Sequence, residues 1–222
     1  MDQMSIFFAV GGLLILALIL ASIAHRYHAY VEERRQHVLR ILKRVDEIEG
    51  LAKRTVGLPV PVEMERILRR DMLARLQAAK GVHARYPGID GMISTAQQAL
   101  EQAAPRAASA AMSEQKIERF SRLMAELEWL VKENRLLVEI DEEEKENLLG
   151  MLVMRHSETL YRYHTGEAKR LLKSNQLHQA LWHSEQIKSI LQNRGLANEQ
   201  FEAWYREADH LHGQVAKRLS GD

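Results

Sequence analysis

The feature that most constrains this chain is an apolar stretch close to its N-terminus. No charged side chain occurs from Gln3 to His25, and residues 5–24 contain twelve Ile, Leu, Phe and Val residues. In a helix that rises about 1.5 Å per residue, roughly twenty residues are enough to cross the ~30 Å hydrocarbon core of a bilayer. We therefore expect a short tail at 1–4, followed by a transmembrane helix at 5–24.

The charges on either side of this helix indicate its orientation. Asp2 precedes it, whereas residues 26–44 carry six Arg and Lys residues against two Glu. Because basic residues stay on the cytoplasmic side of a membrane, the sequence predicts a bacterial-type inner (plasma) membrane protein with its N-terminus outside and its C-terminal domain cytoplasmic. The alternative is a signal peptide, for which residues 22–24 offer a cleavage pattern. Against it, the segment before the run lacks Lys and Arg, and the run is longer than the usual stretch of about 7–15 apolar residues.

The rest of the chain has the composition of a helical protein. Its 222 residues include four prolines and twelve glycines, which argues against a disordered or all-β chain. The absence of cysteine excludes disulfide bonds and thiolate metal sites, and a net charge of +1 gives no general attraction to nucleic acid. We therefore expect an all-α protein, in which a single N-terminal transmembrane helix continues into a stalk and then into a helical-hairpin soluble domain.

Residues 25–56 are expected to form the helical stalk. Val31, Val38, Val45 and Ala52 recur every seven residues, with Ile41 and Ile48 at the intervening apolar positions. This is the spacing of helices that pack along one seam. The seam fits either a coiled coil with a second copy of the chain or packing against the chain's own domain. Small residues in the span would also permit close contact between two anchors, so a homo-oligomer through the anchor and stalk is one expected assembly.

Prolines and an alanine-rich segment divide the part that follows the stalk. A Gly-Leu-Pro-Val-Pro sequence at 57–61 ends the stalk helix, because proline removes a backbone donor and forces the preceding residue to be extended. Apolar residues at helical spacing then predict a short helical pair at 57–104, with helices at 62–80 and 90–103. Residues 105–112 are the expected linker to a C-terminal domain.

The C-terminal domain, residues 113–219, is expected to be a set of helices. Ser113 and Asp141 each precede acidic residues and are suited to cap the start of a helix. We therefore expect one helix from 113 to about 139 and another from 142 onward. A third packing helix is expected after about residue 198.

Part of this domain resembles a known helical repeat. In residues 160–193, a polar turn at 173–176 is followed by Ala180. This pattern resembles a tetratricopeptide-type helix pair, in which small residues let two helices approach closely. The positions of the family's tryptophan and terminal proline hold His164 and Gln192 instead. The resemblance implies a TPR-like surface for protein-protein interaction and no chemistry of its own.

Recognition of a peptide or helix by such a surface requires apolar anchors. We expect four residues from the helices of 145–219 to supply them where their side chains are exposed: Leu171, Leu181, Trp182 and Trp204. The expected partners are therefore other proteins, of unknown identity, in addition to the membrane.

A set of basic residues follows the stalk at 66–85. Its members Arg66, Arg69, Arg70 and Arg75 are expected to contact either an anionic lipid surface near the anchor or an acidic partner. Acidic residues interrupt the set, so a solvated helix face is the alternative, and nucleic acid is the least favoured partner.

The sequence contains no recognisable catalytic motif. It lacks the nucleophile elbow, the phosphate-binding loop, the dinucleotide fingerprint and the zinc-protease motif. Among its ten histidines, His25 and His28 have the spacing of a shared metal, and these two suit a membrane boundary. We therefore expect no catalytic, cofactor-binding or metal site. The predicted function is a single-pass membrane-anchored helical docking or assembly scaffold without catalysis. The alternatives are a secreted or periplasmic helical protein after signal cleavage, and an enzyme without recognisable motifs.

Overall fold

The chain folds into helices joined by short connections. The computed structural model describes residues 3–102, 112–194 and 199–220, and these segments contain no β-strand. The all-α prediction is therefore confirmed for the described part of the chain. The helices are α1 (Gln3–Thr55), α2 (Val62–Val82), α3 (Ile89–Glu101), α4 (Glu114–Lys132), α5 (Glu142–Lys173), α6 (Leu177–Arg194) and α7 (Glu199–Ser220).

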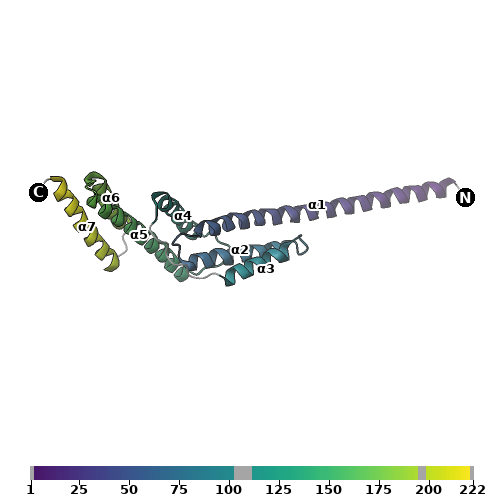
Figure 1. The fold of residues 1–222 in the computed structure, drawn as a ribbon. Coiled ribbons are helices and arrows are strands. Elements are labelled where there is room, and N and C mark those ends of the chain that lie inside the picture. Colours follow the sequence, from purple (N-terminus) through teal and green to yellow (C-terminus); the bar gives the residue numbers. More distant parts are fainter. Residues whose placement is uncertain (1–2, 103–111, 195–198, 221–222) are drawn as a thin grey trace.

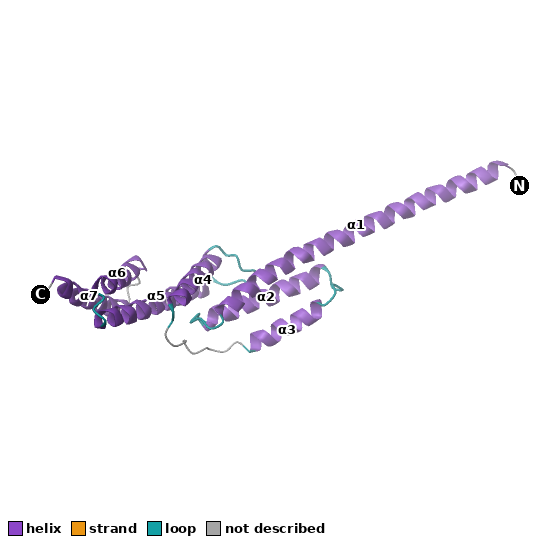
Figure 2. Cartoon of the chain, turned by 45° about the horizontal axis from the view of Figure 1, so that its top comes forward, coloured by secondary structure: helices purple, strands orange, loops and turns teal. Residues whose placement is uncertain are grey.

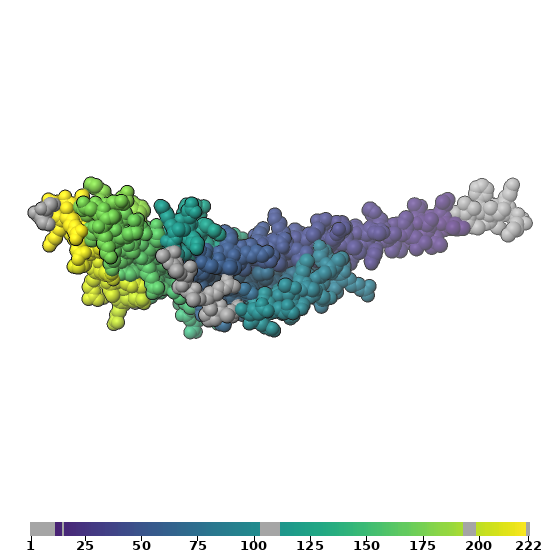
Figure 3. Space-filling view, in the orientation of Figure 1, coloured from purple at the N-terminus to yellow at the C-terminus, as the bar shows by residue number. Residues whose placement is uncertain are grey.

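α1 is one uninterrupted helix of 53 residues. It carries the apolar stretch in its first half, and the expected continuation of that helix beyond the stretch is present. Figures 1 and 3 show that the N-terminal part of α1 projects away from the other helices. α2, α3 and α4 lie beside its C-terminal half, whereas α6 and α7 lie beyond its C-terminal end, and the C-terminus is at the opposite end of the molecule from the N-terminus.

The C-terminal half of α1 packs against α2 and α3. Val38 and Val45 are buried together with Leu76 and Ala79 of α2 and with Ile89 of α3. We call this cluster the α1–α3 core. Val38 has no exposed surface, so the residues of the seven-residue repeat from Val38 onward pack against other helices of the same chain. Of the two interpretations of the repeat, packing on the chain's own domain accounts for it.

A larger core joins four helices across the expected linker. Because α2 precedes residues 105–112 and α4 and α5 follow them, the two parts of the chain share one packing unit. Met112 packs against this core, whereas residues 105–111 lie outside the described segments. We call the cluster the four-helix core. It contains Ile48 and Leu51 of α1, Met64, Ile67 and Leu68 of α2, Phe120, Leu123, Met124, Leu127, Leu130 and Val131 of α4, and Leu148 and Leu152 of α5.

A buried carboxylate on α2 fixes the loop between α4 and α5. Asp71 has no exposed surface. Its Oδ2 atom lies 2.6 Å from Nε of Arg75, and its Oδ1 atom accepts the backbone N–H groups of Leu137 and Val138. A buried charge is tolerated when it is paired and hydrogen-bonded. These contacts therefore hold the loop against α2.

α4 ends at Lys132, whereas the sequence predicted a helix to about residue 139. Asn134 has a left-handed φ of 50°, and its N–H group and that of the next residue bond back to carbonyls of the last turn. Asparagine tolerates this conformation, and the two bonds close the helix end. Leu137, which falls within the helix that the sequence predicted, lies in the loop and is half exposed.

The starts of α4 and α5 and the turn after α5 follow the sequence prediction. The side chains of Ser113 and Asp141 each accept a backbone N–H group from the first turn of their helix. The polar turn after α5 contains Asn175 with a φ of 57°, and it ends α5 by the same left-handed closure that follows α4. Local hydrogen-bonding preferences are therefore sufficient to set these boundaries.

α5, α6 and α7 pack in succession at the C-terminal end of the molecule (Figure 2). α6 packs extensively against both α5 and α7, while α5 and α7 share a small contact. One cluster groups Tyr161 with Ile187, and another groups Leu171 with Ala180 and Val215. The third packing helix expected after residue 198 is α7.

Candidate interaction surface

The four residues expected to anchor a partner differ in exposure. Leu171 is only 2 % exposed, and Leu181 is half-buried against the same cluster. Trp204 stacks on Tyr161, with the ring centroids 5.0 Å apart. Of the four, Trp182 alone is open to solvent, with 51 % of its surface exposed. Trp182 therefore has the exposure that an anchor residue requires, whereas Leu171 and Trp204 pack α5, α6 and α7 together.

Trp182 stands beside a pair of histidines. Nδ1 of His164 on α5 lies 2.8 Å from Nδ1 of His183 on α6. The Trp182 ring lies edge-on to both imidazoles, at centroid distances of 5.9 and 4.8 Å, and Tyr163 is also edge-on to both. We call Tyr163, His164, Trp182 and His183 the aromatic–histidine cluster. Its contacts hold the Trp182 ring in one orientation.

The surroundings of the two histidines favour their neutral forms. Burial, with a smaller contribution from His183, lowers the pKa of His164 to about 4. Burial also lowers the pKa of His183, although the carboxylates of Glu167 and Glu114 oppose this effect. At neutral pH the contact is therefore a hydrogen bond in which one ring donates and the other accepts. In the part of the chain that the structure describes, no group of three or more His, Asp or Glu side chains is arranged to hold a metal ion.

Two further polar contacts lie inside the helix packing. His156 is buried beside Glu128, with Nδ1 3.6 Å from a carboxylate oxygen. The Ser184 hydroxyl lies 3.2 Å from Nδ1 of His212, but it has no exposed surface and donates to a backbone carbonyl. A nucleophilic serine must reach its substrate and give its proton to a base. The arrangement around Ser184 therefore ties helices together and does not present a nucleophile.

The basic residues of α2 do not form one surface. Arg69 is mostly buried and pairs with Glu65 at 2.6 Å. Arg75 is likewise mostly buried and pairs with Asp71. Both side chains also donate to backbone carbonyls outside α2. The expectation that these two arginines contact lipid or an acidic partner is therefore corrected, because their guanidinium groups are used within the chain.

Arg66 and Arg70 remain at the surface of α2. Arg70 lies 3.5 Å from Glu144 at the start of α5. Both residues are close to the N-terminal end of α2, which lies beside the C-terminal end of α1 because the two helices are antiparallel (Figure 1). They therefore lie beside the half of α1 that is far from the apolar stretch.

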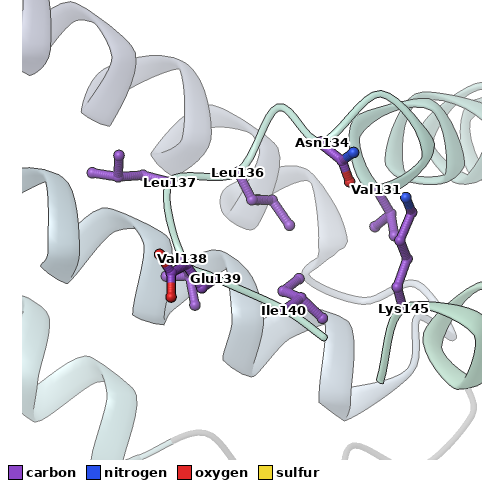
Figure 4. A pocket seen from close by; sticks show the side chains of 8 residues that line it. All are labelled: Val131, Asn134, Leu136, Leu137, Val138, Glu139, Ile140 and Lys145. Atoms are coloured by element: carbon purple, nitrogen blue, oxygen red, sulfur yellow. The ribbon is translucent and has the colours of Figure 1, made fainter. Parts of the chain in front are cut away.

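The loop between α4 and α5 borders a pocket that the sequence did not predict (Figure 4). The pocket has a volume of about 200 Å³. On α4, Trp129 is 51 % exposed, and the guanidinium of Arg135 lies 5.4 Å from its ring centroid. In the sequence, Asn134 after α4 and Asp141 before α5 are the residues that mark the two ends of this loop. The pocket is lined by Val131, Asn134, Leu136, Leu137, Val138, Glu139, Ile140 and Lys145.

A second pocket, of about 330 Å³, lies between the starts of α2 and α5. Its lining combines apolar residues with four carboxylates, which attract basic groups. This acidic surface is at the end of α1 that lies far from the apolar stretch. The lining residues are Glu63, Ile67, Asp141, Glu143, Glu144, Asn147, Leu148 and Met151.

No described part of the chain covers the apolar half of α1. Every described side chain from Gly12 to Tyr30 is exposed, including Leu18 at 70 %. Among the described residues, α1 is the one helix that is long and apolar enough to cross a membrane. A signal sequence meets the same criteria of length and composition, whereas the core helix of a soluble protein would be buried.

Comparison of the chain with protein-family models, with curated proteins and with solved structures gives no match. The resemblance of residues 160–193 to a tetratricopeptide-type helix pair therefore depends on those residues alone. They form the second half of α5, the turn and most of α6. Among the described side chains of this pair, Trp182 is the large apolar one that is exposed, and it borders the aromatic–histidine cluster.

Proposed function

We propose that this chain is a single-pass membrane-anchored docking protein that holds a partner protein at the cytoplasmic face of a bacterial-type inner membrane. The observation that carries the proposal is the construction of α1. The described side chains of its apolar half are exposed, and its other half is built into the α1–α3 core and the four-helix core. Uncovered apolar side chains over the length of a hydrocarbon core are stabilised by lipid and not by water.

The proposed docking surface is the exposed side of α5 and α6 around Trp182. Tryptophan is among the residue types that contribute most to protein interfaces when they enter a pocket of the partner. Contacts with His164 and His183 fix the ring before binding, which reduces the ordering cost of association. The resemblance to a tetratricopeptide-type pair supports the same class of function. The proposed partner therefore presents an apolar pocket or the apolar face of a helix.

Membrane fractionation combined with protease protection tests the anchor. The full-length protein should sediment with the inner membrane and resist extraction at alkaline pH. Its C-terminal domain should be shielded from protease added outside intact spheroplasts. A soluble mature form that begins near His25 would instead support the secreted or periplasmic alternative.

Site-specific cross-linking tests the docking surface. A photoreactive residue at Gln179, which is exposed on α6 one turn before Trp182, should trap one protein in intact cells. Trp182→Ala should remove this product without changing the amount of protein in the membrane. A photoreactive residue at the exposed Ala125 of α4 is the matched control. The same product from position 125, unaffected by Trp182→Ala, would place the docking surface elsewhere.

A further inference from the structure

The antiparallel packing of α1 and α2 brings the turn between α2 and α3 toward the apolar end of α1 (Figure 1). Ala79, near the end of α2, shares a core with Val38, whereas Met64, near its start, shares a core with Leu51. Residues 83–88 of the turn therefore lie level with the segment of α1 that precedes Val38. Among the side chains of α1 that the structure describes, the first that is partly covered is Val31, which marks where this cover begins.

The turn is close to the expected membrane surface. Val31 lies seven positions after Ala24, the last residue of the expected span, and at a rise of about 1.5 Å per residue this corresponds to about 10 Å. The headgroup layer occupies about 5–8 Å of this distance. The remaining gap is smaller than the screening length of about 8 Å at physiological ionic strength. Charges on the turn can therefore interact with lipid headgroups.

This end of the domain is basic. On α1, Arg34 and Arg35 lie on either side of the line through Val31 and Val38, as their helical positions require, so they flank the turn. Arg85 is exposed on the turn itself. Glu32 and Glu33 are the acidic residues of this segment. We call the four exposed arginines at this end the basic collar: Arg26, Arg34, Arg35 and Arg85.

The core beneath the turn holds it in place. Ile89 is only 1 % exposed, and Tyr86 packs half-buried against the α1–α3 core. The Tyr86 ring also lies edge-on to His83, with the centroids 6.2 Å apart. Gly88 has a φ of 81°, a conformation that glycine adopts without strain. The turn therefore holds Arg85 at a fixed distance, measured along α1, from the apolar stretch.

We propose that the basic collar binds the headgroups of anionic phospholipids, and that Arg85 provides a second contact with the membrane beside the spanning helix. An anionic leaflet attracts basic residues that lie close to its surface. A contact on one side of α1 would restrict both its rotation and its tilt, which a single spanning helix leaves free. This inference rests on the proposed anchor and adds a lipid class to it.

A fluorescent label attached to the turn between α2 and α3 tests whether the turn contacts lipid headgroups. The chain contains no cysteine, so Ala84→Cys and Ala125→Cys each provide one labelling site on an exposed alanine. The full-length protein is reconstituted into vesicles of phosphatidylcholine, with or without phosphatidylglycerol, that contain a quencher attached to the headgroups. We expect several-fold stronger quenching at position 84 than at 125. Phosphatidylglycerol should increase the quenching at position 84, and Arg85→Gln should remove much of that increase.

The control outcomes separate the two proposals. Equal quenching at positions 84 and 125, or no effect of phosphatidylglycerol, in protein that still floats with the vesicles would overturn the lipid contact alone. Protein that does not float with the vesicles would overturn the anchor and the contact together. Inorganic phosphate at matched ionic strength should leave the quenching unchanged. Its loss under that condition would show a site for free phosphate in place of a lipid headgroup.

Discussion

The carboxylate of Asp71 accepts the backbone N–H of Leu137, a residue 66 positions later in the chain. The same carboxylate accepts the N–H of Val138 and pairs with Arg75. A residue of α2 therefore positions the loop between α4 and α5, and with it the wall of the pocket in Figure 4. The contact also joins the segments before and after residues 105–112.

Replacement of Asp71 should destabilise the whole domain. Asp71→Ala leaves Arg75 without its partner in a mostly buried site, and we expect the free energy of unfolding to fall by about 3–5 kcal/mol. Urea denaturation of the full-length protein in mild detergent measures this change. Asp46→Ala removes an exposed acid of α1 and should change stability by less than about 0.5 kcal/mol. Equal midpoints for the two variants would show that the buried carboxylate does not stabilise the fold.

The His164–His183 pair predicts a loss of stability in acid. The pKa of His164 is about 4 in the folded protein, below its ordinary value of 6.5, so the unfolded chain binds more protons between these two values. Stability is therefore complete above about pH 6.5 and decreases as the pH falls toward 4. The expected loss is on the order of 3 kcal/mol.

His164→Gln isolates this contribution from the other groups that titrate in the same range. A glutamine can still hydrogen-bond to His183 but cannot take up a proton. Urea midpoints across the acidic range should therefore fall less steeply for the variant than for the natural protein. Parallel pH profiles would mean that the pair does not account for the loss of stability in acid.

Local signals in the sequence were sufficient for several helix boundaries. Ser113 and Asp141 cap α4 and α5 because their side chains bond to N–H groups within the next turn. The long apolar helix also followed from composition, because the absence of charge over some twenty residues depends on no other part of the chain. Its burial in a bilayer is a property of its surroundings and stays a prediction.

Long-range packing decided what the sequence alone did not predict. Leu171 was a candidate anchor in the sequence, but it packs with Val215 and Ala180 and is therefore not exposed. Leu137 has helical spacing but follows a left-handed Asn134. In contrast, the inward position of Arg75 had a sequence signal, because an acid four residues earlier on a helix is placed to pair with it.

Ile48 and Leu39 distinguish packing within the chain from a coiled coil between two copies. Ile48 is 5 % exposed in the four-helix core, whereas Leu39 is 41 % exposed on α1. Ile48→Ala should lower the free energy of unfolding by about 2–5 kcal/mol, and Leu39→Ala by less than about 1 kcal/mol. Urea denaturation gives both values, and sedimentation in detergent gives the assembly state. Dissociation of an oligomer by Ile48→Ala without loss of domain stability would contradict the intrachain use of the repeat.

Trp182 and Trp204 should respond differently to truncation because one ring faces solvent and the other supports the fold. Trp204→Ala removes the ring that stacks on Tyr161, and we expect it to lower the free energy of unfolding by about 2 kcal/mol or more. Trp182→Ala should cost less than about 1 kcal/mol, because half of the side chain is already exposed. It should nevertheless abolish the cross-linked product formed from position 179. A loss of stability in Trp182→Ala as large as that in Trp204→Ala would mean that Trp182 packs the helix pair and does not dock a partner.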